Sequence, residues 1–234
     1  MLIALSIIAV FILVILIVNS KIKHRLIGIV ITLILLLCLQ ALLLADVHEH
    51  WGTTLETSKT TQSINSIAEL PGNRNLLVYK NVGKGQNQNQ IYIYSVLSDR
   101  HMTYSDGVQI KLHSTISTSA TRTKAITRYH YTNNFSQIMF AGIANNNQVK
   151  KTVVTFNLPN NWSVVSSTNA TKIGNSLKKN QVAMQSTIKD QLTTDISNQP
   201  KLAQNNKALS NEKEKLIGNY VQRIINQHHK VKIN

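Results

Sequence analysis

Two long apolar runs separated by a short basic segment open the chain and limit what it can fold into. The runs are Leu2–Val18 and Leu26–Ala45, neither of which holds a charged residue, and the segment between them carries Lys21, Lys23 and Arg25. As helices they would be roughly 26 Å and 30 Å long, against a hydrocarbon core of about 30 Å in a bilayer. The second run is therefore long enough to span a membrane, and the first is close to the lower limit.

The composition of the second run favours a bilayer over the core of a soluble protein. Fourteen of its residues are Leu, Ile or Val, which together contribute on the order of −4 to −8 kcal/mol to membrane insertion. Gly28, Thr32 and Gln40 do not offset that sum. A buried core helix is the alternative, but two such runs in succession, with all nearby charge between them, favour a transmembrane helical hairpin over residues 1–45.

Both helices are expected to be retained and to have a defined orientation. Met1–Ala4 lacks the positive charge of a signal-peptide n-region, and Leu43–Ala45 lacks the small residue that cleavage before Asp46 would need. Basic residues in short loops stay in the cytoplasm, whereas long domains translocate largely regardless of charge. The sequence therefore predicts a two-pass protein of the cell membrane, with the basic segment inside and both termini extracytoplasmic.

The remainder of the chain is strongly basic. Residues 46–234 hold all ten acidic residues and most of the 25 Lys and Arg of a chain whose net charge is +15. Outside a cell, such a surface suits anionic wall polymers or lipid head groups rather than nucleic acid; a merely solubilising surface is the alternative. The sole cysteine, Cys38, lies within the second apolar run, which excludes an internal disulfide and argues against thiol catalysis.

Between residues 76 and 168, short segments rich in β-branched and aromatic residues alternate with Asn, Gly and Pro clusters, as strands alternate with turns. A turn is expected at 83–89 and a polar loop at Asp99–His101. This pattern favours a small antiparallel sheet, a sandwich or a partial barrel. The strands expected from it are Leu76–Lys80, Ile91–Leu97, Val108–His113, Gln137–Ile143, Val149–Leu158 and Trp162–Val165.

After about Lys172 the apolar spacing changes to that of two amphipathic helices, interrupted at Pro200. These helices pack on the sheet, pair with each other or bind a partner. The predicted fold class is α+β. Its expected parts are a transmembrane helical hairpin over 1–45, a juxtamembrane spacer or weak edge strand over 46–75, an antiparallel β-rich extracytoplasmic domain over 76–168 and C-terminal amphipathic helices over 169–234.

One extended segment, Thr115–Tyr131, carries a basic stripe. Because side chains alternate between the two faces of a strand, Arg122, Lys124, Arg128 and His130 share one face. Arg122, Lys124 and Arg128 are the predicted polyanion contacts. The alternative is a solvated sheet face, which is the usual meaning of such alternation.

Catalytic and metal-binding signals are weak throughout. His48 and His50 flank Glu49, but the spacing matches no H-E-x-x-H motif and no cysteine is at hand. These residues, with Trp51, fit a polar and aromatic collar at the membrane surface better. No nucleophile elbow and no carboxylate pair can be nominated. We therefore predict no catalytic residues, no metal site, no cofactor and no enzymatic activity.

Several short motifs recur in a recognisable order: His50-Trp51-Gly52, Leu77–Lys80 with Val82-Gly83, the Thr-rich strand Thr121–Arg128, and Leu158–Trp162. Together with the apolar hairpin they resemble a domain-of-unknown-function family of uncharacterised two-helix membrane proteins from lactic-acid bacteria. The resemblance covers nearly the whole chain and implies a Gram-positive cell. Family members are similar to proteins often encoded beside drug-efflux permeases, which implies a permease as a partner.

The expected function is that of a membrane-anchored cell-envelope protein without catalytic activity, an accessory or partner of a membrane permease. Its expected partners are the lipid bilayer and a permease or envelope polymer, with no nucleic acid. One alternative is an extracytoplasmic module that binds a polyanion, either wall polymer or anionic lipid. Another is an envelope enzyme acting on wall polymer. No oligomeric state is predicted.

Overall fold

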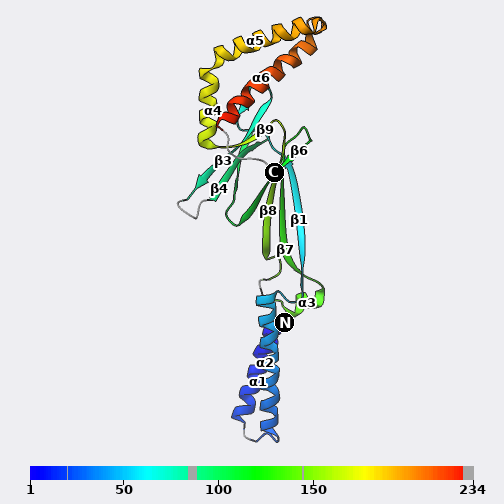
Figure 1. Ribbon diagram of the computed structural model, residues 1–234. Helices are drawn as coiled ribbons and strands as arrows, with labels where there is room; N and C mark the ends of the chain where they lie inside the picture. Colours follow the sequence, from blue (N-terminus) through cyan, green and yellow to red (C-terminus); the bar gives the residue numbers. More distant parts are fainter. Residues whose placement is uncertain (20, 84–88, 144, 229–234) are drawn as a thin grey trace. The chain divides into compact units, whose positions relative to one another are not determined.

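A computed structural model of the chain describes residues 1–19, 21–83, 89–143 and 145–228. The protein is α+β, as its sequence predicts, with apolar helices first, strands next and polar helices last (Figure 1). The elements are α1 (Leu2–Val18), α2 (Arg25–Glu49), β1 (Thr53–Ser63), β2 (Glu69–Leu70), β3 (Arg74–Val82), β4 (Asn89–Val96), β5 (Asp99–Tyr104), β6 (Val108–Thr115), β7 (Thr121–Tyr131), α3 (Asn134–Met139), β8 (Val149–Pro159), β9 (Trp162–Ser166), α4 (Ser167–Lys179), α5 (Gln181–Asn198), the 3-10 turn η2 (Pro200–Leu202) and α6 (Asn206–His228).

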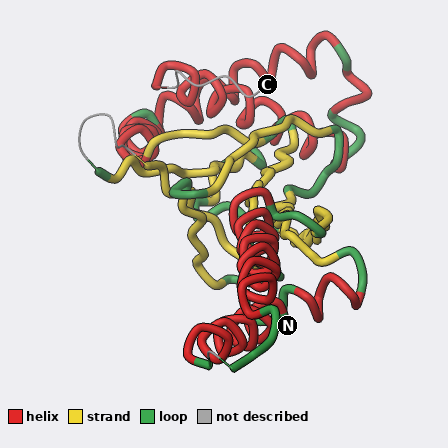
Figure 2. The backbone as a smooth tube through the Cα atoms, turned by 90° about the horizontal axis from the view of Figure 1, so that it is seen from below, coloured by secondary structure: helices red, strands yellow, loops and turns green. Residues whose placement is uncertain are grey.

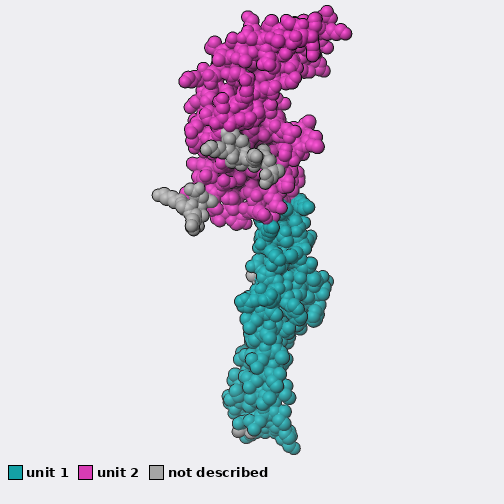
Figure 3. Space-filling view, viewed as in Figure 1, with its two compact units in different colours: residues 1–59, 125–152 teal, residues 60–124, 153–234 magenta. Residues whose placement is uncertain are grey.

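The residues divide into two compact units, coloured separately in Figure 3. Unit 1 comprises residues 1–59 and 125–152, and unit 2 comprises residues 60–124 and 153–234. The strands β1, β7 and β8 contribute residues to both units. Each unit has its own buried apolar side chains, so each is described by itself.

The strands form two sheets. One sheet has four strands in the order β1-β7-β8-β6, and the other has the order β2-β3-β4-β5, with β9 paired to β3. The β3–β4 and β4–β5 pairs are antiparallel, with Tyr79 opposite Tyr92 and Tyr92 opposite Thr103. The β3–β9 pair is parallel, with Leu77 opposite Val164. The second sheet is therefore mixed rather than purely antiparallel as predicted.

Unit 1 is built on α1 and α2, which a short connection joins and which lie side by side and antiparallel (Figure 1). Figure 2 shows the helices from below as red coils. Their contact is close at Gly28, where a Cβ atom would lie 3.3 Å from a methyl group of Leu16. At the opposite end of the pair, the buried Leu2, Leu39 and Phe140 form a small cluster. Phe140 follows α3, so this cluster joins the short helix α3 to the helix pair.

Unit 2 has two apolar clusters on opposite faces of β3. Leu77 packs with Tyr92, Phe156 and Val164 between the two sheets. Leu76 and Val78, which point to the other face, pack with Ile173 of α4 and Val221 and Ile225 of α6. Three consecutive residues of β3 are buried because a sheet covers one face and helices cover the other.

Four sequence-based predictions need correction. Gln137–Ile143 is not a core strand: Asn133 caps the helix α3 by accepting a hydrogen bond from the Ser136 amide at 2.8 Å. Asp99–His101 is part of strand β5, because Leu97 and Ser98, both at positive φ, turn the chain tightly after β4. The C-terminal segment holds three α-helices rather than two, since the chain breaks at Asn180 as well as near Pro200. Helix α2 continues past Ala45 to Glu49.

Other predictions are confirmed. The strands at 76–80, 91–97, 108–113, 149–158 and 162–165 are present as β3, β4, β6, β8 and β9. β1 is an edge strand in the expected spacer. The turn predicted at 83–89 falls mostly outside the described residues. Of the choices left open for the C-terminal helices, α4 and α6 pack on β3, and α5 pairs with α6.

Candidate functional site

The helix pair exposes an apolar surface that nothing in the described chain covers. Helix α2 is long and apolar enough to cross a membrane, and most of its apolar side chains are exposed. Helix α1 is shorter, but is apolar on all sides and equally uncovered. Exposed aliphatic and aromatic residues on the pair include Ile7, Ile8, Phe11, Val14, Ile15, Leu26, Ile31, Leu35 and Leu37.

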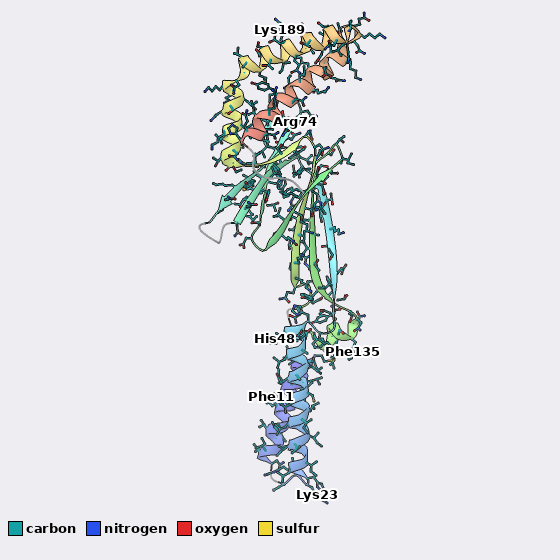
Figure 4. All side chains as sticks on the ribbon, viewed as in Figure 1. Phe11, Lys23, His48, Arg74, Phe135 and Lys189 are labelled. Carbon is teal, nitrogen blue, oxygen red and sulfur yellow. The ribbon has the colours of Figure 1, made fainter. Side chains whose placement is uncertain are left out.

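The charged groups of this region lie at the ends of the helix pair. In Figure 4, Lys23 lies at the connection between the helices, Phe11 lies along the pair, and His48 lies at the opposite end beside α3. The connection carries Lys21, Lys23 and Arg25, and the opposite end carries Asp46 and Glu49. A length of uncharged helix thus separates two polar ends, which is the pattern of a membrane-embedded segment.

A buried carboxylate fixes the last turn of α2 to the sheet of unit 1. Asp46 is fully buried, and its Oδ2 accepts a hydrogen bond of 3.0 Å from the hydroxyl of Tyr131, at the end of β7. The amide Nδ2 of Asn145 donates to the Asp46 backbone oxygen at 2.6 Å and to Oδ2 at 3.2 Å. Three segments far apart in sequence therefore meet at one side chain, which holds α2 firmly where it leaves the apolar region.

The electrostatics of this cluster favour a protonated tyrosine. Burial raises the pKa of Tyr131 well above its ordinary value of 10.0, and its hydrogen bond to Asp46 raises it further. A phenol that keeps its proton remains a donor to the carboxylate across the ordinary pH range. Asp46 Oδ1 is buried and has no partner among the described residues. The arrangement suits a structural role, in which Asp46 fixes the end of α2 to Tyr131 and Asn145; we call these three residues the Asp46 joint.

His50 ends α2 in a left-handed conformation. Its ring packs edge-on against Tyr129, with 3.7 Å between the ring centres. Within the residues that the structure describes, no three His, Cys, Asp or Glu side chains group as metal ligands would. His48 and His50 thus lie at the polar end of α2, where the predicted collar belongs.

The basic stripe lies on β7, but its members have different surroundings. Arg122 and Lys124 belong to unit 2, and Arg128 to unit 1. Arg122 donates from Nε to Thr103 Oγ1 at 3.0 Å, and its guanidinium lies 5.7 Å from the centre of the Tyr94 ring. This side chain is therefore held against β4 and β5. In the described part of the chain, none of the three predicted polyanion contacts forms a salt bridge.

Arg128 lines a cavity of about 380 Å³ in unit 1, together with Glu56, Ser58 and His130. His130 Nε2 lies 3.6 Å from Glu56 Oε2. The negative charge of Glu56 lowers the local positive potential beside Arg128 in the same cavity. The stripe is thus partly compensated on its unit 1 side.

An apolar cavity of about 490 Å³ opens beside α3, in unit 1. Leu2 and Leu42 contribute from the helix pair, Trp51 follows α2, and Phe135, Met139 and Phe140 contribute from α3 and its end. The N-terminal amine donates to the backbone oxygen of Ile138 at 3.0 Å, which ties α3 to the start of α1.

Sequence reasoning missed the Asp46 joint and helix α3. Tyr131 and Asn145 are 85 and 99 residues away from Asp46, and no local pattern links residues so far apart. For α3 a local signal was present: Asn133 is a good helix cap, three residues before Ser136. The apolar residues that follow favour a strand when only their composition is considered.

These features define an α+β protein whose helix pair presents an uncovered apolar surface and whose strands and remaining helices bury their own apolar residues. Residues 20–173 match the family described as Domain of unknown function (DUF4811), so the chain belongs to that family. The match confirms the predicted kind of family, one without a known function; the lactic-acid bacterial source and the two-helix membrane character of its members stay predictions. Helices α1, α5 and α6 lie outside the matched residues. No curated protein and no solved structure matches the chain.

Proposed function

We propose that the protein is a two-pass, membrane-anchored envelope protein without catalytic activity, which holds its strands and C-terminal helices outside the cell. The observation that carries this proposal is the uncovered apolar surface of α1 and α2. Soluble proteins rarely expose apolar patches larger than a few hundred Å². A bilayer would solvate these side chains and would leave no backbone polar group unpaired, because both segments are helical.

The orientation follows from the charges at the two ends of the pair. Lys21 and Lys23 lie in the short connection and Arg25 begins α2, and basic residues at short connections stay in the cytoplasm. Both termini are then extracytoplasmic. α1, at 17 residues, is at the short end of spanning helices, and Asn19 and Met1 would extend it at its ends.

Site-directed labelling tests this topology, because Cys38 is the only cysteine. In a Cys38→Ala background, single cysteines are placed at Ile22, between the basic residues, and at Val182, which is 79% exposed on α5. The substitution at Ile22 keeps all three positive charges. A membrane-impermeant maleimide added to intact protoplasts should label Val182→Cys, and should label Ile22→Cys only after permeabilisation.

Both variants should react in detergent, which shows that each thiol is accessible. Labelling of Ile22→Cys in intact protoplasts, with protection of Val182→Cys, would mean an inverted orientation. Recovery of the protein in the soluble fraction after alkaline extraction would contradict the proposed membrane anchoring itself.

The accessory role beside a permease rests on the family resemblance and on the surface of the helix pair, which could pack against other helices in a bilayer as well as against lipid. Crosslinking in cells followed by purification in mild detergent and mass spectrometry should recover a membrane transporter. Crosslinks confined to the protein itself would leave an anchor without a permease partner.

Polyanion binding by Arg122, Lys124 and Arg128 is the second candidate, favoured by their lack of salt bridges within the described residues. Replacing all three by Gln should abolish retention on an anionic polymer column at low salt, because it removes the three positive charges that would hold the polymer. Retention of the parent should also weaken at physiological salt, where charges are screened over about 8 Å. A matched control replaces Lys172, Lys178 and Lys179 of α4, which are exposed. Equal loss in both variants would mean that net charge alone governs retention.

A further inference from the structure

The apolar cavity beside α3 has no role in anchoring or in polyanion binding, yet it has an unusual lining. Its walls are almost entirely hydrocarbon and aromatic, and Ser136 supplies the one side-chain hydroxyl. Its volume of about 490 Å³ is within the range of small-molecule sites. Such a lining cannot satisfy a head group or a sugar, because it offers few hydrogen bonds.

The outer wall of the cavity consists of large apolar side chains that are exposed to solvent, which is unfavourable in water. Phe135 is 71% exposed and Trp51 is 56% exposed. Ile138, on the same short helix, is also exposed. A helix of six residues is not stable by itself in water. Here it is held by the Asn133 cap, by the N-terminal amine and by the packing of Phe140, so its exposed apolar face is fixed in place.

The position of the cavity indicates its occupant. Leu2 and Leu42 belong to the helix pair, so the lining includes side chains from the same two helices whose exposed apolar surface would face lipid. Trp51 comes directly after α2, where tryptophan typically marks the boundary between acyl chains and head groups. A cavity at that depth would lie within reach of the acyl chains. Figure 4 shows Phe135 beside this end of the helix pair, opposite the end that carries Lys23.

We propose that this cavity binds one acyl chain of a bilayer phospholipid, held between α3, Trp51 and the ends of α1 and α2. The inference rests on the proposed membrane anchoring and adds a defined lipid site to it. The bound acyl chain would cover apolar surface of Phe135 and Met139 that water otherwise contacts. Burial of apolar surface is favourable in rough proportion to its area. Lipid bound in this way would complete the packing of α3.

The test uses the full chain in nanodiscs of phosphatidylcholine with a small fraction of the same lipid carrying a photoreactive group on one acyl chain. After illumination, adducts are mapped by mass spectrometry. The expected result is a saturable adduct on the segment 135–140, several-fold more abundant per residue than adducts along α1 and α2.

Two variants and one control define the site. Ser136→Phe, which would fill the cavity, should lower the adduct at 135–140 at least fivefold. Phe135→Ala removes an exposed part of the wall, cannot disturb the core and should also lower the adduct; it keeps the test decisive if Ser136→Phe does not fold. Val14→Phe, at an exposed position on α1 away from the cavity, should leave the adduct unchanged.

The outcomes separate this inference from the proposed function. Adducts spread evenly along α1 and α2, and unchanged in Phe135→Ala, would overturn the lipid site while supporting membrane anchoring. No adducts on α1 or α2 at all would overturn the anchoring and the lipid site together. Adducts concentrated at 135–140 and lost in the cavity variants would support both.

Discussion

The two units of this protein differ in whether their apolar side chains are buried or exposed. In unit 2, the large apolar residues of β3 and β9 are buried on both faces of their sheet, with those of β8 packed against one of these faces, and helices α4 and α6 turn one apolar stripe inward. In unit 1, only a few residues of α1 and α2 are buried, among them Leu2, Ala9 and Leu39, while most of their aliphatic side chains are exposed. Both units contain well-formed helices, so secondary structure does not distinguish them.

The difference shows which environment each unit requires. The helices of unit 2 carry Lys, Asn and Gln on their outer faces, so water can surround them. A helix that is apolar on every side needs either a protein core or a lipid environment. The described chain provides no core around α1 and α2, which agrees with the proposed lipid environment. The stability of the two units should therefore respond to different substitutions.

The largest expected effect separates a buried from an exposed phenylalanine. Phe156 is fully buried in unit 2, with its ring 5.5 Å from that of Tyr92 and 5.6 Å from that of Tyr94. Phe156→Ala should destabilise unit 2 by about 3–5 kcal/mol, because it removes packing and leaves a cavity. The matched control Phe135→Ala should change stability in detergent by less than about 0.5 kcal/mol. Pulse proteolysis in urea measures both, and equal effects would contradict the comparison.

The next effect distinguishes lipid from water around exposed helix residues. Leu37 lies at the middle of α2 and is 69% exposed, whereas Val182 on α5 is 79% exposed. Leu37→Arg should oppose membrane insertion by about 2.5–3.5 kcal/mol, the cost of an arginine at a helix centre. Val182→Arg should have little effect. Membrane association is measured by alkaline extraction, with Leu37→Ile as a control. If Leu37→Arg inserted as efficiently as the parent protein does, α2 would lie outside lipid.

These contrasts also show which features the sequence could predict. The helix pair followed from composition alone, and strands such as β3 and β8 followed from their β-branched residues, because these signals are local. The parallel pairing of β9 with β3 was not predictable, since Trp162 and Asn75 meet only through the fold. The Asp46–Tyr131 hydrogen bond and the cavity beside α3 depend in the same way on residues distant in sequence. At the basic stripe, sequence placed Arg122 on a strand face but could not foresee its contact with Tyr94.

A smaller effect tests how closely the helices of unit 2 are packed. Gly218 of α6 lies against the turn at Gly72, and a Cβ atom at Gly218 would lie 2.8 Å from the Gly72 oxygen. Arg74 reinforces this contact by donating from Nε to the Gly218 oxygen at 3.1 Å. Gly218→Ala should therefore destabilise unit 2 by about 1–3 kcal/mol through overpacking, although alanine is the better helix former.

The control for that substitution lies on α4. A Cβ atom at Gly174 would meet nothing within 4 Å, so Gly174→Ala should stabilise unit 2 by about 0.5–1 kcal/mol. Both are measured by urea unfolding of the full chain. If the two substitutions changed stability in the same direction, the close contact between α6 and the turn at Gly72 would not exist in solution.

The smallest effect compares one tyrosine in each unit through pH, the half-buried Tyr131 in unit 1 and the buried Tyr92 in unit 2. Burial raises the pKa of both Tyr131 in unit 1 and Tyr92 in unit 2 above the ordinary value of 10.0; the hydrogen bond to Asp46 adds to the rise at Tyr131, and the nearby Tyr79 adds to it at Tyr92. Below pH 10 both phenols are protonated whether the chain is folded or unfolded, so their contribution is fully present. As the pH rises above 10, the unfolded chain loses these protons first, and stability falls.

Removing either phenol should therefore flatten the alkaline loss of stability. Tyr131→Phe should cost about 0.5–1.5 kcal/mol at neutral pH, because the hydrogen bond to Asp46 is lost, and should make the decline above pH 10 shallower in unit 1. Tyr92→Phe, which loses a hydrogen bond of 2.7 Å to Gln90, should do the same in unit 2. Hydrogen exchange followed by mass spectrometry between pH 9 and 12 resolves the units separately, after correction for the exchange rate of the unfolded chain at each pH. An unchanged dependence of stability on pH in unit 1 of Tyr131→Phe would contradict the raised pKa of the Tyr131 phenol.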